Sequence, residues 1–200
     1  MTTTRPPLAM RAIKYETAMW RSLYRWITRR PIEGEAYPYT GPVMTILWAF
    51  IGVSAVELPI LHLILPWPTV RLIADILGVY GLIWMIGLMA SLKVNPHVVT
   101  GESIRIRNGL SLDLTLHRAD VAGARARNRT LEPGKGIRIE TEGDRRILYL
   151  AVAHNTSVDL VLRYPMAVEL PKGLSEPVDE IRIYADDPKA MAARIQRLVA

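Results

Sequence analysis

The stretch "ELPILHLILPWPTVRLIADIL", residues 57–77, decides the fold of this chain because it joins two apolar stretches, 41–65 and 68–92. A helix crosses a membrane with about 20 predominantly apolar residues, and the two stretches together are more than twice that length. Pro66 and Pro68 each lack a backbone N–H donor and clash with the preceding helical turn, so a break is expected between the stretches. The sequence therefore predicts two transmembrane helices joined by a very short turn.

The charges that flank these stretches predict the orientation of the hairpin. Basic residues lie outside both ends of the pair, whereas the turn has none before Arg71; they are Arg25, Arg29 and Arg30 on one side and Lys93, Arg105 and Arg107 on the other. Because cytoplasmic flanks are enriched in Lys and Arg, we expect a multi-pass protein of the inner (plasma) membrane with both termini in the cytoplasm. The alternative is a helical hairpin buried in a soluble protein. The rest of the 200-residue chain would then have to enclose both apolar helices.

Four ionisable residues interrupt the apolar pattern of the hairpin. At a rise of about 1.5 Å per residue, Glu57, Asp75, His62 and Arg71 lie roughly 15, 12, 8 and 6 Å from a turn near Trp67. Arg71 and Asp75 have the spacing of an ion pair on one helix face, and Glu57 and Asp75 lie at similar depths, where two carboxyls could share a proton. Two interpretations stay open: the polar groups hold the two helices together, or they contact another membrane subunit or respond to protons or cations.

The amino-terminal segment has the pattern of an amphipathic helix. Within residues 8–31, apolar side chains recur at helical spacing, and a basic face lies opposite them before Pro31 ends the pattern. Such a helix suits the cytoplasmic headgroup layer. We assign residues 1–40 to this interfacial helix and a linker, with a membrane-surface basic set of Arg21, Arg25, Arg29 and Arg30. The alternative is a solvated basic helix docked on the following domain.

Residues 93–200 change to the period of two that is typical of β-strands. Asn108 and Gly109 form a hairpin turn signal between two alternating runs. Roughly seven short strands are predicted, at 103–107, 110–117, 124–129, 136–143, 145–153, 157–170 and 178–185. Asp187 and Pro188 then begin a closing helix as N-cap and first-turn residues. The fold class is therefore a membrane α-helical hairpin, 41–92, followed by a soluble, mainly-β domain, 93–200.

The order of these elements resembles bacterial membrane proteins that carry a pleckstrin-homology-like domain after a transmembrane hairpin. The stretches that carry the resemblance are "HVVTGESIRIRNGLSLDLTLHRADVAGARAR", residues 97–127, and "VDEIRIYADDPKAMAARI", residues 178–195. The resemblance covers about residues 42–200 and implies an antiparallel barrel of about seven strands, capped by a carboxyl-terminal helix. It also implies a binding or assembly role.

One strand of the predicted domain is rich in arginine. Arg125, Arg127 and Arg129 alternate on one strand, and a loop that contains Lys135 follows. Pleckstrin-homology domains that recognise phosphoinositides use basic side chains around an open strand end, so these residues are candidates for an anionic-lipid or partner-binding face. The alternative is a solvated surface.

The sequence contains no motif that indicates catalysis. It has no cysteine, no P-loop, no dinucleotide-binding glycine pattern and no histidine pair at metal-ligand spacing. We therefore expect no enzyme activity, cofactor, metal or nucleic-acid partner. The expected function is an accessory or scaffolding subunit of a membrane complex, with anionic lipid and a membrane protein or a homo-oligomer as partners. The alternatives are a sensor of anionic lipid and a proton-responsive membrane component that uses Glu57 and Asp75.

Overall fold

The computed structural model describes residues 8–29, 31–171 and 173–200, except for the side chains of residues 8, 9 and 11. The chain divides into two compact units, which are described separately. The helical unit has described residues 8–29 and 44–94, and the β unit has residues 31–43, 95–171 and 173–200.

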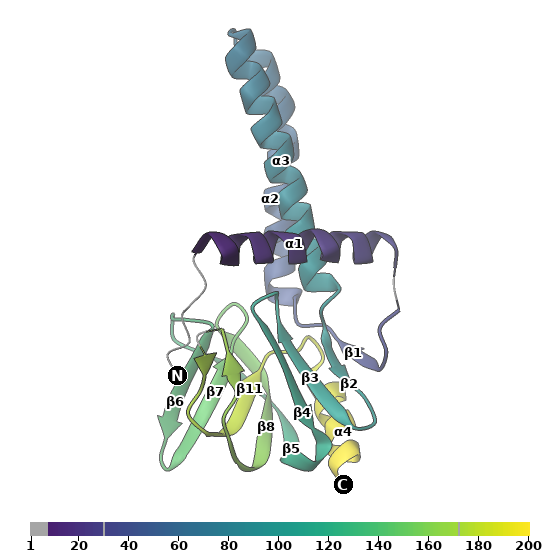
Figure 1. The fold of residues 1–200 in the computed structure, drawn as a ribbon, viewed down its shortest axis with the longest axis vertical. Coiled ribbons are helices and arrows are strands. Elements are labelled where there is room, and N and C mark those ends of the chain that lie inside the picture. Colours follow the sequence, from purple (N-terminus) through teal and green to yellow (C-terminus); the bar gives the residue numbers. More distant parts are fainter. Residues whose placement is uncertain (1–7, 30, 172) are drawn as a thin grey trace. The chain divides into compact units, whose positions relative to one another are not determined.

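The helical unit contains the expected hairpin. Helix α2 spans Gly41–Ile64, although its first three residues belong to the β unit, and helix α3 spans Pro68–Lys93 (Figure 1). Both helices are long and apolar enough to cross a membrane. Only 6% and 11% of their most apolar windows are buried within the chain, whereas the core helices of a soluble protein would be mostly buried. The prediction of two long apolar helices with a break at the prolines is confirmed, and their exposure is consistent with a membrane hairpin.

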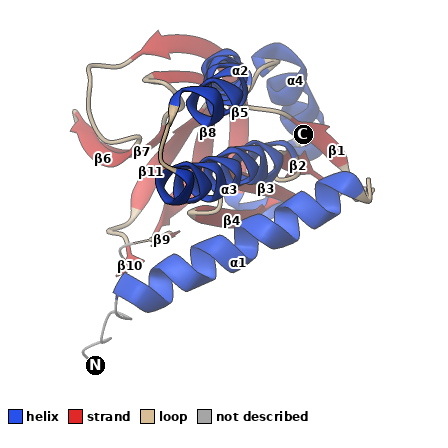
Figure 2. Ribbon diagram, turned by 90° about the horizontal axis from the view of Figure 1, so that it is seen from above, coloured by secondary structure: helices blue, strands red, loops and turns tan. Residues whose placement is uncertain are grey.

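Helix α1, Leu8–Ile27, packs crosswise against α3, on the side of α3 that faces away from α2 (Figures 1 and 2). Met19 is fully buried at this crossing. A Cβ atom added at Gly87 would lie 3.2 Å from Cγ of Met19, so a glycine is what lets the two helices approach closely. The predicted amphipathic helix is therefore present, and it docks on a neighbouring helix within its own unit.

The β unit contains one four-stranded and one five-stranded sheet (Figure 1). The first has the order β1-β2-β3-β4, formed by Glu35–Tyr37, His97–Val99, Ser103–Asn108 and Leu112–His117. The second has the order β5-β8-β11-β7-β6, formed by Val121–Thr130, Asn155–Met166, Val178–Ile183, Arg145–Leu150 and Ile137–Glu142. A short ribbon pairs β9, Glu169–Leu170, with β10, Gly173–Leu174, and a 3₁₀ turn, Arg118–Asp120, precedes β5.

The predicted antiparallel barrel is wrong in two respects. In the described part of the chain the sheets do not close into a barrel, and β11 pairs with β7 in parallel. Strands β7 and β8 follow one another along the chain, yet β11 lies between them. The physical reason is burial: residues 147–150 of β7 and 180–183 of β11 are all buried, so both faces of these strands are covered. Strands of that kind occupy the centre of a sheet, and they can pair in parallel.

The core of the β unit joins both large sheets to the closing helix. Alternate residues of β3, β4 and β8 point inward, among them Ile104, Leu116 and Leu160, which are fully buried. Helix α4, Pro188–Val199, begins at the predicted N-cap, where a carboxylate oxygen of Asp187 accepts a hydrogen bond from N–H of Ala190 at 3.0 Å. It buries Met191 and Ile195 against this core. The prediction of a mainly-β domain with a closing helix is confirmed.

The end of the segment assigned to the interfacial helix and linker, residues 31–40, is part of the β unit, together with residues 41–43 from the start of the predicted hairpin. Strand β1 pairs with β2, and Tyr39 is only 2% exposed. The hydroxyl of Tyr39 accepts a hydrogen bond from N–H of Gly109 at 2.8 Å, and its ring stacks on His97 with centroids 4.6 Å apart. A three-residue strand carries too little periodicity to be read from sequence, so this addition to the sheet was not predicted.

Candidate functional site

The hairpin brings together only two of its four ionisable side chains. Nδ1 of His62 lies 2.7 Å from a carboxylate oxygen of Asp75, which joins α2 to α3. Neither the predicted Arg71–Asp75 pair nor a Glu57–Asp75 contact is present in the described part of the chain. The side chains of Glu57 and Arg71 make no hydrogen bond or ion pair with any described residue.

A groove of about 410 Å³ lies between α2 and α3, and Glu57 is on its wall. The other lining residues are apolar or small, among them Ser54, Ala74 and Gly81. Leu58 of α2 lies close to Gly78 of α3, since a Cβ at that glycine would lie 2.3 Å from a methyl carbon of Leu58. The hairpin therefore presents a carboxyl group in an otherwise apolar groove.

The contacts of α1 show which edge of this helix faces the turn of the hairpin. Glu16 accepts hydrogen bonds from the hydroxyl of Tyr80 at 2.7 Å and from the indole N–H of Trp20 at 3.4 Å. Tyr80 lies seven residues nearer the turn than Gly87, or about 10 Å along α3. At the opposite end of α3, Arg25 donates a hydrogen bond to the carbonyl of Val94 at 3.4 Å. One edge of α1 thus faces the turn and the other faces the base of the hairpin.

These two edges of α1 differ in polarity. Exposed apolar side chains flank Glu16 on the edge that faces the turn: Ile13, Tyr24 and Ile27. Lys14, Arg21 and Arg25 share the edge that faces the base, by their helical spacing. Lys93 at the end of α3 adds a further cation, 6.0 Å from the ring centre of Trp26. Arg29, in the turn after α1, is also exposed, whereas Arg30 lies outside the described residues.

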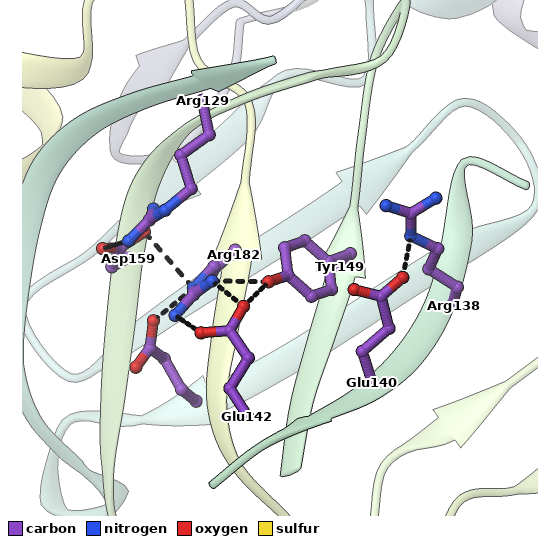
Figure 3. Close-up of polar contacts among 8 residues, drawn as sticks. Arg129, Arg138, Glu140, Glu142, Tyr149, Asp159 and Arg182 are labelled. Carbon is purple, nitrogen blue, oxygen red and sulfur yellow. Dashed lines mark hydrogen bonds and ion pairs between the residues drawn. The ribbon is translucent and has the colours of Figure 1, made fainter. Parts of the chain in front are cut away.

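A row of polar residues crosses the five-stranded sheet on the face opposite the core. The strand register aligns Arg125, Asp159, Arg182, Tyr149 and Arg138, one from each strand. Figure 3 shows the central members pointing toward one another from neighbouring strands. Asp159, Arg182 and Tyr149 are at most 7% exposed, so the centre of this row is a buried polar network.

Arg182 is the centre of the network. It donates to Glu180 at 2.6 Å, to both carboxylate oxygens of Glu142 at 2.8 and 2.9 Å, and to the hydroxyl of Tyr149 at 2.5 Å. Tyr149 donates in turn to Glu142, and its ring lies 5.2 Å from the guanidinium carbon of Arg182. Arg129 binds both oxygens of Asp159. Every buried charge of this row therefore has an opposite charge within reach, as a stable buried network requires.

The ionisation of these groups follows from their contacts. Hydrogen bonds from Arg182 and then from Tyr149 lower the pKa of Glu142. Burial, followed by the hydrogen bond to Glu142, raises the pKa of Tyr149 to about 12. Near neutral pH the carboxylate is therefore ionised and the phenol is protonated. This is the state in which the phenol donates to the carboxylate.

An open hollow of about 600 Å³ lies beside this network. Arg127, Arg129, Arg138 and Arg182 contribute to its wall, together with Glu132, Glu140 and Glu142. Arg138 lies 2.7 Å from Glu140 as an ion pair (Figure 3). Of the four predicted basic residues, Arg127 and Arg129 thus line the hollow, and Arg129 is neutralised by Asp159. Arg125 and Lys135 are exposed but do not line it.

Sequence reasoning missed the central residues Arg182, Glu180 and Tyr149. The signal was the segment "DEIRIY", in which Glu180 and Arg182 share one face of a strand whose other face is apolar. Among the described residues, no group of three His, Cys, Asp or Glu side chains could hold a metal ion. The hollow therefore offers paired charges and hydrogen-bonding groups, which suit the binding of a polar surface or headgroup.

Comparison with known proteins adds no family. No protein-family model, curated protein or solved structure matches the chain. The sequence and the geometry above are therefore the basis for the function.

Proposed function

We propose that this chain is a non-catalytic integral membrane protein that presents its β unit at the cytoplasmic face of the inner membrane, as an accessory or scaffolding subunit of a membrane complex. One observation carries the proposal: α1 is fixed on α3 with its apolar edge toward the turn of the hairpin and its basic edge toward the base. A helix oriented in this way suits a headgroup layer that surrounds the base of a membrane-spanning hairpin.

The basic edge of α1 also supports the orientation. Arg21, Arg25 and Lys93 lie at the base of the hairpin, where the anionic cytoplasmic leaflet attracts cations. The order of hairpin, mainly-β domain and closing helix supports kinship with membrane proteins that carry a pleckstrin-homology-like domain. The open sheets and the parallel pair distinguish this domain from the barrel of that family.

The orientation can be tested with single cysteines, because the chain has none of its own. Trp67→Cys places a thiol in the turn, and Asp144→Cys places one in the exposed turn between β6 and β7. In intact cells, an impermeant maleimide should label the first position from outside and should label the second only after the membrane is opened. Labelling of Asp144→Cys in intact cells would contradict the proposal.

The subunit role is tested by purifying the tagged full-length protein from its native membrane in mild detergent. A membrane protein that co-elutes in stoichiometric amount supports the role. A matched control is the charge-reversed chain Arg125→Glu/Arg127→Glu, which changes the exposed strand and leaves the buried network intact. Purification of the unaltered chain without any protein partner would reject the subunit role.

A sensor of anionic lipid is the second candidate, favoured by three exposed cations. Arg125, Arg127 and Lys135 have no ion-pair partner among the described residues. In nanodiscs, anionic lipid should slow amide exchange across residues 125–135 more than zwitterionic lipid does, and Arg125→Glu/Arg127→Glu should remove the difference. Arg145→Glu, at the exposed start of β7, is the matched control. Equal protection in the two lipids would reject this function.

A further inference from the structure

Glu57 and Arg71 are opposite charges that the hairpin leaves without a partner in the described part of the chain. His62 and Asp75, the other two ionisable residues, already satisfy each other at 2.7 Å. In hydrocarbon, an ionised side chain without a partner is costly, and such residues face protein or water rather than lipid. The complement of Glu57 must therefore come from outside the single hairpin.

The surroundings of Glu57 suit another helix. Ser54, Ala74 and Gly81 line the groove beside Glu57, and small residues of this kind allow helix backbones to approach closely in membranes. The groove is about 410 Å³ in volume and lies between α2 and α3. Helix α1 leaves it open, because α1 packs on the side of α3 that faces away from α2 (Figure 2).

We propose that a second copy of this chain occupies the groove, so that Glu57 of each hairpin pairs with Arg71 of the other. The proposal rests on the membrane location proposed above. Charge complementarity selects the second copy, because one chain carries both unpaired groups. A two-fold interface between two copies forms the Glu57–Arg71 contact twice, once in each direction. Parallel copies keep every residue at its own depth. The depths of Glu57 and Arg71 then differ by roughly 9 Å along the hairpin axis. The long arginine side chain and the glutamate side chain together span this distance.

Charge exchange between two differently tagged copies tests this pairing. Glu57→Arg alone and Arg71→Glu alone each place like charges at both contacts, so self-capture should fall at least about tenfold below that of the unaltered chain. Co-expression of the two variants places opposite charges at both contacts, and capture of one by the other should recover. An intramolecular role for either residue cannot produce this recovery. Loss without recovery, or unchanged self-capture by either variant, overturns the proposal.

A second measurement keeps both charges, so its result does not depend on how the charge variants fold. In the cysteine-free chain, Ser54→Cys and Leu61→Cys place single thiols on the groove, and Gly52→Cys is the control, because nothing lies within 4 Å of a Cβ at that position. Oxidation in native membranes should link the groove variants into dimers and leave the control monomeric. Equal crosslinking at all three positions overturns the proposal. Crosslinking of the groove variants to a different membrane protein, and not to a second copy, also overturns the proposal.

The two proposals fail in distinguishable ways. If the protein is removed from membranes by alkaline carbonate, the membrane location is wrong and the pairing falls with it. If the protein stays in the membrane but neither crosslinks nor captures a second copy, only the pairing is wrong.

Discussion

The two units differ in whether their charged side chains have partners. In the β unit, Arg182 is 7% exposed and is bound by Glu180, Glu142 and Tyr149 within the same domain. In the helical unit, Glu57 and Arg71 have no comparable partner among the described residues.

This difference separates a structural role from a candidate interface. A buried network with all its charges paired needs nothing from outside, so it specifies how five strands fit together. An unpaired carboxyl in an apolar hairpin is stable only where another molecule or a proton neutralises it. The predictions below test how far the two units differ in this respect.

The largest expected effect is the loss of Arg182. Arg182→Met leaves Glu180, Glu142 and Tyr149 without their shared donor, and removal of one partner from a buried ionic network costs about 3–5 kcal/mol. Hydrogen exchange of β7, β8 and β11 in the full-length protein measures this change. Arg145→Met, at the exposed start of β7, should change stability by less than about 0.5 kcal/mol. Equal effects of the two substitutions would show that the network does not stabilise the sheet.

The pH dependence of the β unit should come largely from His97. Burial lowers the pKa of His97 to about 4; the hydrogen bond to the carbonyl of Tyr184 opposes this shift, and the charge of Arg107 adds to it. Nδ1 of His97 accepts a hydrogen bond from N–H of Arg107 at 3.1 Å, which only the neutral ring can do. The unfolded chain therefore takes up a proton before the folded chain does as the pH falls.

The free energy of unfolding should therefore fall by roughly 3 kcal/mol as the pH drops from about 6.5 to about 4. Unfolding of the full-length protein by urea, followed at pH 7.5 and at pH 4.5, measures it. His97→Gln keeps one acceptor and one donor but does not titrate, so its stability should vary less over this range. If the unaltered protein and the variant respond equally to pH, His97 is not the cause.

The hairpin should tolerate an added methyl group at Gly52 but not at Gly78. Gly78→Ala places a Cβ 2.3 Å from a methyl carbon of Leu58, so the Leu58 side chain must shift and the hairpin should lose stability. Gly52→Ala meets nothing within 4 Å and should be neutral or slightly stabilising. All five tryptophans lie between residues 20 and 84, so their fluorescence reports on the helices during unfolding in mixed micelles. Equal stability of the two variants would show that α2 and α3 do not pack closely at Gly78.

The smallest expected effect concerns the contact that orients α1. Tyr80→Phe removes the hydrogen bond to Glu16 at 2.7 Å and should weaken the docking of α1 slightly. Faster amide exchange in α1, with unchanged exchange in the β unit, is the expected result. Tyr15→Phe is the control, because no hydrogen bond of its hydroxyl to a described residue is present. If exchange in α1 does not change, this contact does not orient the helix.

The sequence by itself determined those features that depend on local chemistry. Apolar length and the two prolines specified α2 and α3, alternation specified most strands of the β unit, and Asp187 with Pro188 specified the start of α4. These patterns are readable because helix caps, proline breaks and side-chain periodicity act over a few neighbouring residues.

Only the tertiary structure decided which distant residues meet. The sequence contains Arg182 and Glu142 forty positions apart, and only the insertion of β11 between β8 and β7 brings them into contact. Likewise, Asp75 lies four residues from Arg71 but contacts His62 on the other helix. Periodicity specifies the face on which a side chain lies, whereas the choice of neighbouring strand or helix depends on how all the buried surfaces of the domain fit together.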